Sequence, residues 1–522
     1  MSLPAGDGEL AAGMEELSLG GGGEGDDRLG ALPDDVLRSI LLRLPSTAAA
    51  ARTSVLSRRW RRLWTQLPEI RFPFPSSPAS VLPALASRTS SSPGLRLIHV
   101  ACRDAPAAAT DAWLLAAAAP GRLAPGGEIY FYNRTPGDER QQVGAAAWQR
   151  TAFRLPCFEA AAKLWLRLGF AHLDLPPASG SGGVFARLTE LRLERVHFRC
   201  GGYHLGDVLS MPQCPALRDL RISIARGVEK LTIVSETLER LELDILYGLE
   251  ELTVMAPVLR ALNVHACFAW RKPVAMVCVP RLELLWWNDA FDPSLTIFGI
   301  GDGDEEAASL QQLTTFNIPV YGRFDYALLQ DYVMLLQHFP VVHRLDLKLI
   351  YERDLSQFEY LMEIITGLPN IQTLSLWLQT KGHAIGASVF HLLSICPGIR
   401  KLQVTLLDNF KVDTPCTSVC ACGQQPNLSK CYTLDVLDEV EIHNFRGSGH
   451  DFAFVDTLFS MSKDIKRLTI TYHHLARPSE EPCKDLCSLG TPGICSEIYF
   501  NTTEVLYQPP SSFFPKTPDD QL

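Results

Sequence analysis

The sequence lacks the segments that would place it in or across a membrane. No apolar run reaches the about 18 residues that a spanning helix needs. The Ala-rich stretch Ala105–Pro120 is short and is interrupted by Asp111. The N-terminus has neither the basic nor the apolar region of a secretory signal and begins with small and acidic residues. We therefore expect a protein of the cytoplasm and/or nucleus, in which the 14 cysteines stay reduced.

Motifs that carry chemistry are also lacking. The sequence contains no Gly-x-x-x-x-Gly-Lys-[Ser/Thr], no Gly-x-Ser-x-Gly and no His-Glu-x-x-His. The run Gly299–Glu306 lacks the ligand order of a calcium loop and is typical of an acidic surface loop. We therefore expect no catalytic residues, no enzyme activity and no cofactor.

One cysteine cluster leaves zinc as an open alternative. Its members lie within sixteen residues, in a segment that also holds Pro and Gly: Cys416, Cys420, Cys422 and Cys431. Four thiols can hold tetrahedral zinc, but the spacing is not the paired Cys-x-x-Cys of zinc ribbons and fingers. Free thiols in a long loop are favoured, and we expect no metal site.

The chain has no excess of basic residues. It has 58 acidic and 48 basic residues, which give a net charge of −10 and argue against a general binder of nucleic acid or anionic membranes. The charge is unevenly placed, because residues 1–27 hold only acidic charges whereas residues 28–72 are basic. Residues 1–27 are also Gly-rich, so we expect a disordered acidic tail. We expect residues 476–522 to be irregular, with disorder from about residue 509.

The first folded unit that the sequence predicts is a compact helical unit at residues 28–72. Pro33 followed by two Asp suits the start of a helix, because carboxylates favour the positive end of the helix dipole. Pro45 ends this helix, Ser46 or Thr47 can cap a second, and Ser57 can cap a third. A unit of about 45 residues is too small to bury all of its apolar side chains, so some must contact a partner or the next domain.

These residues resemble the F-box of plant proteins. The resemblance rests on Leu32-Pro33-Asp34-Asp35-Val36-Leu37 and on Ser54-Val55-Leu56-Ser57-Arg58-Arg59-Trp60, with Trp64 following in order. It implies that the unit docks onto the Skp-type adaptor of a cullin–RING ubiquitin ligase. By position, the implied adaptor-binding residues are Leu32, Pro33, Val36, Leu37, Ile40, Leu41, Leu44, Val55 and Leu56, with Trp60 and Trp64 nearer the unit's own core. The alternative is a helical cap for the repeats that follow.

After a Pro- and Ser-rich linker at residues 73–94, the pattern Leu-x-x-Leu-x-Leu recurs at spacings of 21 to 38 residues. This is leucine-rich-repeat periodicity, in which stacked strands share one core. Clear copies begin at Leu188, Leu217, Leu238, Leu259, Leu282, Leu313, Val342, Ile371, Ile399, Leu437 and Ile465, and weaker ones at Leu95, Gly126 and Ala161. The predicted fold is α/β: a small all-α F-box followed by a solenoid.

The chain is expected to pass from one repeat strand to the next in two ways, through a helix or through a second strand. Helical stripes such as Ala327–Leu336 between the later copies predict strand–helix repeats. Half-matches at Val228–Ile233 and Leu249–Val254 lie out of phase with the main copies and predict strand–strand repeats in the middle. The predicted solenoid spans residues 95–430.

The C-terminal part refines the resemblance. Leu437–Gly447 contains Val-Glu-Ile, Phe and Gly, followed by His450 and the repeat copy at Ile465. This segment resembles that of plant F-box/leucine-rich-repeat proteins of the FBD-containing group, and we expect FBD-like terminal repeats at residues 431–475.

The leading functional hypothesis is a non-catalytic substrate receptor of a ubiquitin ligase. Motif positions three, five and seven should face away from the core and offer Trp165, Trp286 and Trp377 to a target protein. An alternative is a repeat scaffold or inhibitor that engages no ligase. A small-molecule receptor would need convergent basic groups, and no concentrated set of Arg and Lys stands on the expected inward strands. No nucleic-acid or membrane partner is expected.

Overall fold

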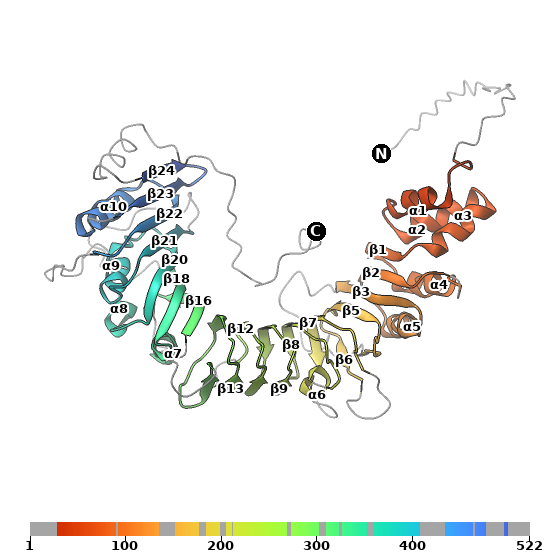
Figure 1. Cartoon of the computed structure of the whole chain (residues 1–522), viewed down its shortest axis with the longest axis horizontal. Coiled ribbons are helices and arrows are strands. Elements are labelled where there is room, and N and C mark those ends of the chain that lie inside the picture. The colour runs from red at the N-terminus through yellow and green to blue at the C-terminus, as the bar shows by residue number, and fades with distance from the viewer. Residues whose placement is uncertain are drawn as a thin grey trace, which may run out of the picture.

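The computed structural model describes residues 29–89, 92–134, 152–176, 184–198, 205–210, 212–268, 273–301, 309–322, 326–351, 359–407, 434–462, 465–476 and 495–499. The acidic tail at 1–27, the residues from about 509, the acidic run at 302–306 and the cysteine cluster at 416–431 lie outside these residues. The expectation that residues 476–522 are irregular is wrong for Cys495–Tyr499, which form a strand that pairs with the preceding repeat strand and so continue the sheet. The described chain forms an open arc with a small helical unit at its N-terminal end (Figure 1). The expected α/β class is confirmed. None of the described helices combines the length and apolarity of a membrane span.

The N-terminal helical unit follows the caps that the sequence indicates. Ser46 accepts a hydrogen bond from the Ala49 backbone N–H at 3.1 Å, and Ser57 caps the third helix. The unit consists of α1 (Asp34–Leu42), α2 (Thr47–Arg52), η1 (Thr53–Val55), α3 (Arg58–Leu63) and η2 (Trp64–Gln66). Its own core is complete and contains Leu37, Leu41, Ala50, Trp60, Leu63 and Leu67.

The repeat strands form one long parallel sheet that is not closed. Strand pairing runs from β1, next to the helical unit, to β24 at the far end, and neighbouring strands are parallel. In order of pairing the strands are β1 (Glu69–Ser76), β2 (Leu95–Arg103), β3 (Leu123–Arg134), β5 (Ala161–Arg167), β7 (Glu190–Phe198), β8 (Asp219–Arg226), β10 (Arg240–Tyr247), β12 (Ala261–His265), β14 (Leu284–Asn288), β16 (Ser309–Pro319), β18 (Val341–Ile350), β20 (Asn370–Gln379), β21 (Lys401–Leu406), β22 (Glu439–Phe445), β23 (Arg467–Tyr472) and β24 (Cys495–Tyr499). Short strands β4 (Ala152–Arg154) and β6 (His172–Asp174) join it beside β7.

The outer side of the arc alternates between helices and strands, as expected. The two out-of-phase half-matches form β9 (Lys230–Val234) and β11 (Glu251–Met255), which continue into β13 (Val274–Cys278) and β15 (Thr296–Gly299) as a second parallel sheet. Elsewhere helices cover the outer side (Figure 1). These are α4 (Val81–Ala86), which follows η3 (Pro78–Ser80), α5 (Ala107–Ala118), α6 (Leu205–Leu209), α7 (Tyr326–His338), α8 (Leu361–Ile364), α9 (Gly386–Ser394) and α10 (Gly449–Met461), with the small pair β17 (Tyr321–Gly322) and β19 (Glu359–Tyr360).

The side-chain register of the main sheet agrees with the repeat motif, with one correction. Positions four and six of successive copies pair across the strands and are buried, as at Leu374 and Leu376. The copy assigned to Leu313 instead begins at Leu310, because Leu313 pairs with Leu285 and therefore occupies position four. The sequence could not decide this, since Leu310 and Leu313 are both apolar and stand three residues apart.

A residue in the left-handed backbone conformation lies near the end of several repeat strands. At position eight the backbone has positive φ in Arg195, Ile224, Ile245, Ala266, Asn317 and Asn444. This conformation costs an L-residue roughly 1–2 kcal/mol. The left-handed residue acts as a bulge that interrupts the alternation of side chains between the two faces of the strand. The side chain of the next residue, at position nine, therefore points into the core. The side chains that are buried in this way are Val196, Ala225, Leu246, Cys267, Ile318 and Phe445.

The helical unit and the solenoid are joined without a free linker. Residues 73–94, expected to be a linker, hold the end of β1, η3 and α4. The Arg88 guanidinium is buried and donates to the Leu67 carbonyl at 2.6 Å and the Pro93 carbonyl at 2.5 Å. Burial and the nearby charge of Arg122 lower the pKa of Arg88 to about 10. The backbone N–H of Arg71 in β1 also donates to Thr47 of α2 at 2.8 Å.

The strand register predicts opposite effects for two adjacent substitutions. Leu374→Asp places a carboxylate in the shared core and should lower the free energy of unfolding by several kcal/mol. Thr373→Asp should be tolerated, because Thr373 faces away from the core and its register partners are Arg344 and Lys401. Thermal melting of both variants tests this, and equal losses would show that the register is wrong.

The junction predicts a role for Arg88 in stability. Arg88→Met keeps much of the buried aliphatic volume but leaves two carbonyl groups without their charged donor. We expect a loss of about 2–4 kcal/mol in the free energy of unfolding, from the cost of unsatisfied buried polar groups. Arg96→Met, at an exposed arginine of β2, is the matched control. Equal melting temperatures for the two variants would contradict the proposed role of Arg88.

Candidate protein-binding surfaces

The helical unit exposes apolar side chains although its own core is complete. Val55 is 87% exposed and Leu56 is 62% exposed, at the turn that joins η1 to α3. Val36 and Ile40, one turn apart on α1, are also exposed. Pro33 is exposed, and Leu32 and Leu44 are half-buried. These residues can therefore contact a partner without any change in the unit.

Leu37 and Leu41 were expected to bind a partner, but both lie in the core of the unit. Leu37 is fully buried and Leu41 is 2% exposed. The stripe Val36, Leu37, Ile40, Leu41 and Leu44 is thus divided between two faces of α1. An apolar stripe in a sequence cannot distinguish the face that packs internally from the face that is left for a partner.

One arginine fixes the start of α1 against α3. The Arg59 guanidinium donates to the carbonyls of Gly30 at 2.7 Å and Leu32 at 2.6 Å, and it pairs with the Asp34 carboxylate at 2.5 Å. The basic cluster of α3 therefore has one structural member, whereas Arg58, Arg61 and Arg62 are exposed.

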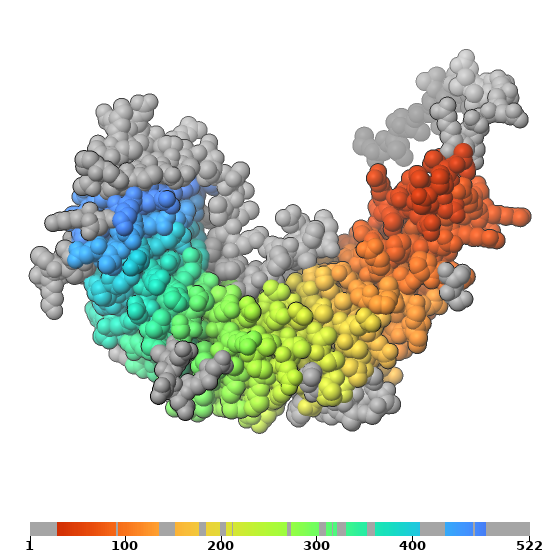
Figure 2. All heavy atoms as spheres, viewed as in Figure 1, coloured from red at the N-terminus to blue at the C-terminus, as the bar shows by residue number. Residues whose placement is uncertain are grey.

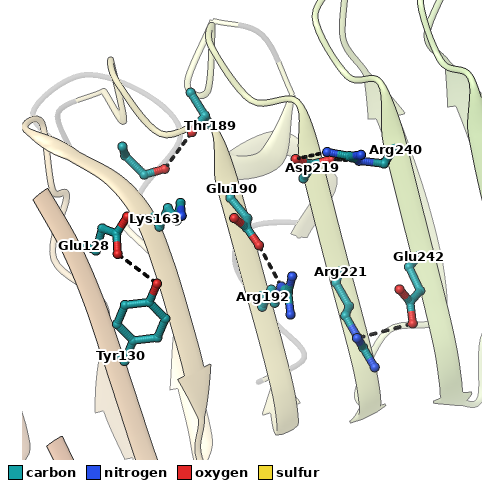
Figure 3. Close-up of polar contacts among 11 residues, drawn as sticks. Glu128, Tyr130, Lys163, Thr189, Glu190, Arg192, Asp219, Arg221, Arg240 and Glu242 are labelled. Atoms are coloured by element: carbon teal, nitrogen blue, oxygen red, sulfur yellow. Dashed lines mark hydrogen bonds and ion pairs between the residues drawn. The ribbon is translucent and has the colours of Figure 1, made fainter. Parts of the chain in front are cut away.

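The second surface is the inner face of the arc, where positions three, five and seven of the motif stand in rows. Figure 3 shows polar side chains of β3 to β10 pointing from this face and contacting one another along and across strands. Cross-strand ion pairs join Lys163 to Glu128 at 3.1 Å, Arg240 to Asp219 at 2.9 Å between Nη2 and Oδ2, and Arg221 to Glu242 at 3.2 Å. Since opposite charges alternate across strands, they stabilise the register.

An aromatic and cationic column stands in the central row near the helical unit. The rings of Tyr130 and Trp165 meet edge to face, with centroids 4.6 Å apart. The Arg192 guanidinium lies over the Trp165 ring at 3.9 Å. These three residues are register partners on β3, β5 and β7, so the column forms from side chains that are distant in sequence.

The three tryptophans expected on the inner face are buried to different extents. Trp165 and Trp286 do stand in the central row, but they are only 6% and 5% exposed, because neighbouring side chains cover them. The expectation that they are exposed for a target is wrong. Trp377 is half-buried between Lys348 and Thr405 in the row of position seven, and its role in target binding stays a prediction.

Glu242 is a buried carboxyl at the centre of this face. It is 1% exposed, and within the described residues its Oε2 atom has no hydrogen-bond partner. Asn263 on β12 is the register partner of Glu242. Its buried Oδ1 atom also has no hydrogen-bond partner within the described residues. Burial raises the pKa of Glu242 to about 7, and the positive charge of Arg221 only partly opposes this.

Comparisons with known proteins match both the helical unit and part of the solenoid. Residues 29–72 match the family model of the F-box domain. Residues 142–347 match the model of the leucine-rich repeats of the FBD-associated F-box protein At5g56370. The chain thus has an F-box domain followed by leucine-rich repeats that are similar to those of FBD-associated F-box proteins. Its F-box is the helical unit, and its repeats are the solenoid described above.

Proteins similar to parts of this chain occur in Arabidopsis thaliana. The F-box/FBD/LRR-repeat protein At4g03220 is 28% identical over 280 residues, which are 50% of this chain and 51% of that protein. The F-box/FBD/LRR-repeat protein At2g04230 is 55% identical over 47 residues, which are 9% of this chain and 10% of that protein. F-box/LRR-repeat protein 25 is 42% identical over 66 residues, or 12% of this chain and 26% of that protein. The match to At4g03220 thus spans about half the length of either protein.

The FBD-like segment of this F-box/leucine-rich-repeat protein continues the solenoid. β22, α10 and β23 extend the parallel sheet beyond β21, as expected for terminal repeats. A capping box begins α10, in which Ser448 and Asp451 exchange side-chain and backbone hydrogen bonds. Physically, this segment adds a strand–helix–strand unit and no separate core.

Several residues of the inner face were not predicted from the sequence. Glu242 and Arg192 are single polar residues in separate repeats, and nothing near them in the sequence marks them. The available signal is the repeat register itself, which places both at position five. Their burial depends on neighbours from other repeats, which the register does not describe.

The buried carboxyl predicts a change of stability with pH. The pKa of Glu242 in the folded state lies above its unfolded value of about 4.5, so ionisation opposes folding as pH rises from about 5 to 8. Glu242→Gln removes this penalty, which is about 3 kcal/mol at pH 8. We expect the melting temperature of the variant, relative to the wild type, to increase with pH. Glu236→Gln, at an exposed carboxylate, is the control, and the same pH trend in both variants would refute the assignment.

Proposed function

We propose that this chain is the substrate-recognition subunit of an SCF-type cullin–RING ubiquitin ligase. In this proposal the F-box holds a Skp-type adaptor, and through it a cullin, while the inner face of the solenoid holds a target protein. The observation that carries the proposal is the exposure of Val55 and Leu56 on a unit whose core is already complete. The chain itself would be non-catalytic and would act in the cytoplasm and/or nucleus.

The energetics of the exposed side chains support docking. Burial of a Val or Leu side chain in an interface contributes roughly 1.5–3 kcal/mol. Val55 and Leu56 can therefore supply roughly half of the about 8 kcal/mol of a micromolar complex, and Val36 and Ile40, each 38% exposed, can add smaller amounts. A helical cap for the repeats would instead turn such side chains toward the solenoid. Here Trp64 makes that contact, since it packs against the cores of both the F-box and the solenoid.

The shape of the solenoid supports target capture. Figure 2 shows a packed arc with a hollow between the F-box end and the last repeats. The strands that line the inner face are held by their neighbours on both sides, so the side chains on this face are ordered before a target binds. Preorganised side chains lose little conformational entropy on binding. Trp377, half-buried near the later repeats, remains the proposed tryptophan contact.

The proposal predicts that exposed and buried F-box residues behave differently. The double variant Val55→Asp with Leu56→Asp should abolish co-purification with a Skp-type adaptor and leave the melting temperature nearly unchanged, because charged side chains at exposed positions do not disturb the core. Leu37→Asp should lower the melting temperature as well, since Leu37 lies in the F-box core.

Ile297→Asp is the matched control. Ile297 is 58% exposed on β15, far along the solenoid, so its substitution should leave adaptor binding unchanged. Undiminished co-purification of the Val55/Leu56 variant would contradict the docking surface. Failure of the wild-type chain to bind any Skp-type adaptor would favour a repeat scaffold or inhibitor outside a ligase.

A further inference from the structure

The F-box carries exposed arginines that no described residue neutralises. Residues 28–72 contain nine arginines and only three acidic residues. Four of these arginines are exposed and form no ion pair within the described part of the chain, and we call them the arginine face: Arg52, Arg58, Arg61 and Arg62. In the sequence they flank Val55 and Leu56, because Arg52 ends α2 and the other three lie on α3.

The helix holds three of these charges close together. Arg58 is three residues from Arg61 and four from Arg62 on α3. Positions with this spacing are neighbours on a helix surface, with Cβ atoms about 5–6 Å apart, and like charges there destabilise the helix. A bound carboxylate relieves this repulsion and accepts hydrogen bonds from a guanidinium group. The arginine face is therefore suited to an acidic segment.

The chain enters the F-box beside this face. The Arg59 guanidinium, on the same helix, donates to the carbonyl oxygens of Gly30 at 2.7 Å and Leu32 at 2.6 Å. These bonds tie the first described residues to α3. Whatever precedes Gly30 in the sequence is therefore attached next to the arginine face.

The segment attached there has the opposite charge. Residues 1–27, which lie outside the described residues, contain seven acidic residues and neither Arg nor Lys. Asp26 and Asp27 stand within four residues of Gly30, a separation that the chain spans in at most about 14 Å. The whole segment extends up to about 90 Å, so each of its carboxylates can reach the arginine face.

We propose that the acidic segment 1–27 binds the arginine face of its own F-box and competes there with the Skp-type adaptor. The competition rests on the proposed function, in which Val55 and Leu56 contact the adaptor, whereas the contact between the segment and the face does not. Attachment at Gly30 favours this segment over other acidic molecules, because a short connection gives it an effective concentration of about 1 mM. A contact with a dissociation constant of about 1 mM is half occupied at that concentration.

Fluorescence anisotropy tests the contact directly. The probe is a fluorescein-labelled peptide of residues 1–27, and its partner is the full chain in which the seven acidic residues of the segment are replaced by the corresponding amides. We expect binding that weakens about tenfold or more between about 50 and 500 mM NaCl, because salt screens exposed charges. The same peptide with amides in place of its acidic residues should not bind, and equal binding by both peptides refutes the contact.

The arginine face is tested by the triple variant Arg58→Gln with Arg61→Gln and Arg62→Gln. It should weaken peptide binding about tenfold and leave the melting temperature nearly unchanged, since the three side chains are exposed and outside the core. If this variant does melt at a lower temperature, the comparison of the two peptides on the unchanged F-box decides.

The matched control removes the same charge from exposed arginines outside the F-box. Its three positions also form no ion pair within the described residues, and the substitutions are Arg96→Gln, Arg281→Gln and Arg400→Gln. The control should change the peptide affinity less than twofold. Equal weakening by the control and by the triple variant of α3 would reduce the contact to general electrostatics and overturn the site.

Adaptor binding by the full chain tests the competition. At about 50 mM NaCl, replacing the seven acidic residues by amides should tighten the binding of a Skp-type adaptor about threefold or more, and the difference should vanish at about 500 mM NaCl. In the triple variant of α3 the same replacement should have no effect, because the face that holds the segment is lost. An equal gain in both backgrounds would show that the segment repels the adaptor directly and would overturn the competition.

Other occupants of the face have distinct outcomes. Dimers of the wild type at low salt that disappear in the triple variant would assign the face to the acidic segment of a second copy. Tighter binding of an oligonucleotide than of the peptide would overturn the choice of a protein segment. Failure of the wild type to bind any Skp-type adaptor refutes the ligase role alone, since the peptide measurements still decide whether the contact exists.

Discussion

The structure depends on the sharing of one apolar core between successive parallel strands. No strand of the solenoid can bury positions four and six of its motif alone, because both residues lie on one face and need neighbours on either side. Leu374, for example, is covered by Leu345 of β18 and Leu402 of β21, its partners in register. The first and last strands of such an array leave one side of the shared core open, so another element must cap each end. At the N-terminal end the F-box meets this need through Trp64, while Arg88 satisfies carbonyl groups at the junction.

This arrangement separates stability from recognition. The core residues point to one side of the sheet, so the other side can vary in chemistry without loss of the fold. The inner face uses that freedom for ion pairs, the Tyr130–Trp165–Arg192 column and the carboxyl of Glu242. The left-handed residue at position eight extends the core to position nine. Its energetic cost is offset by the burial of side chains such as Leu246, which lies fully inside.

The sequence allowed most of the architecture to be predicted. Repeat spacing indicated the solenoid, the out-of-phase copies indicated β9 and β11, and Ser and Pro indicated the helix boundaries of the F-box. The errors concern which face a side chain occupies and what covers it. Leu37 and Leu41 share a stripe with exposed residues but pack inside, and Trp165 stands on the expected face but is covered by Arg192. The copy at Leu313 was misplaced by three residues, because both choices preserve an apolar pattern.

By itself, the sequence determined the order of the units, the period of the repeats and the residues able to fill the core, since these depend on local patterns of apolar, Pro and capping residues. Only the tertiary structure decided which side chains meet. Tyr130 and Trp165 are separated by a whole repeat, as are Glu242 and Asn263, and neither pair is visible in a local pattern. They come together because parallel strands stack in register, which aligns equivalent positions of different repeats at the distance between neighbouring strands.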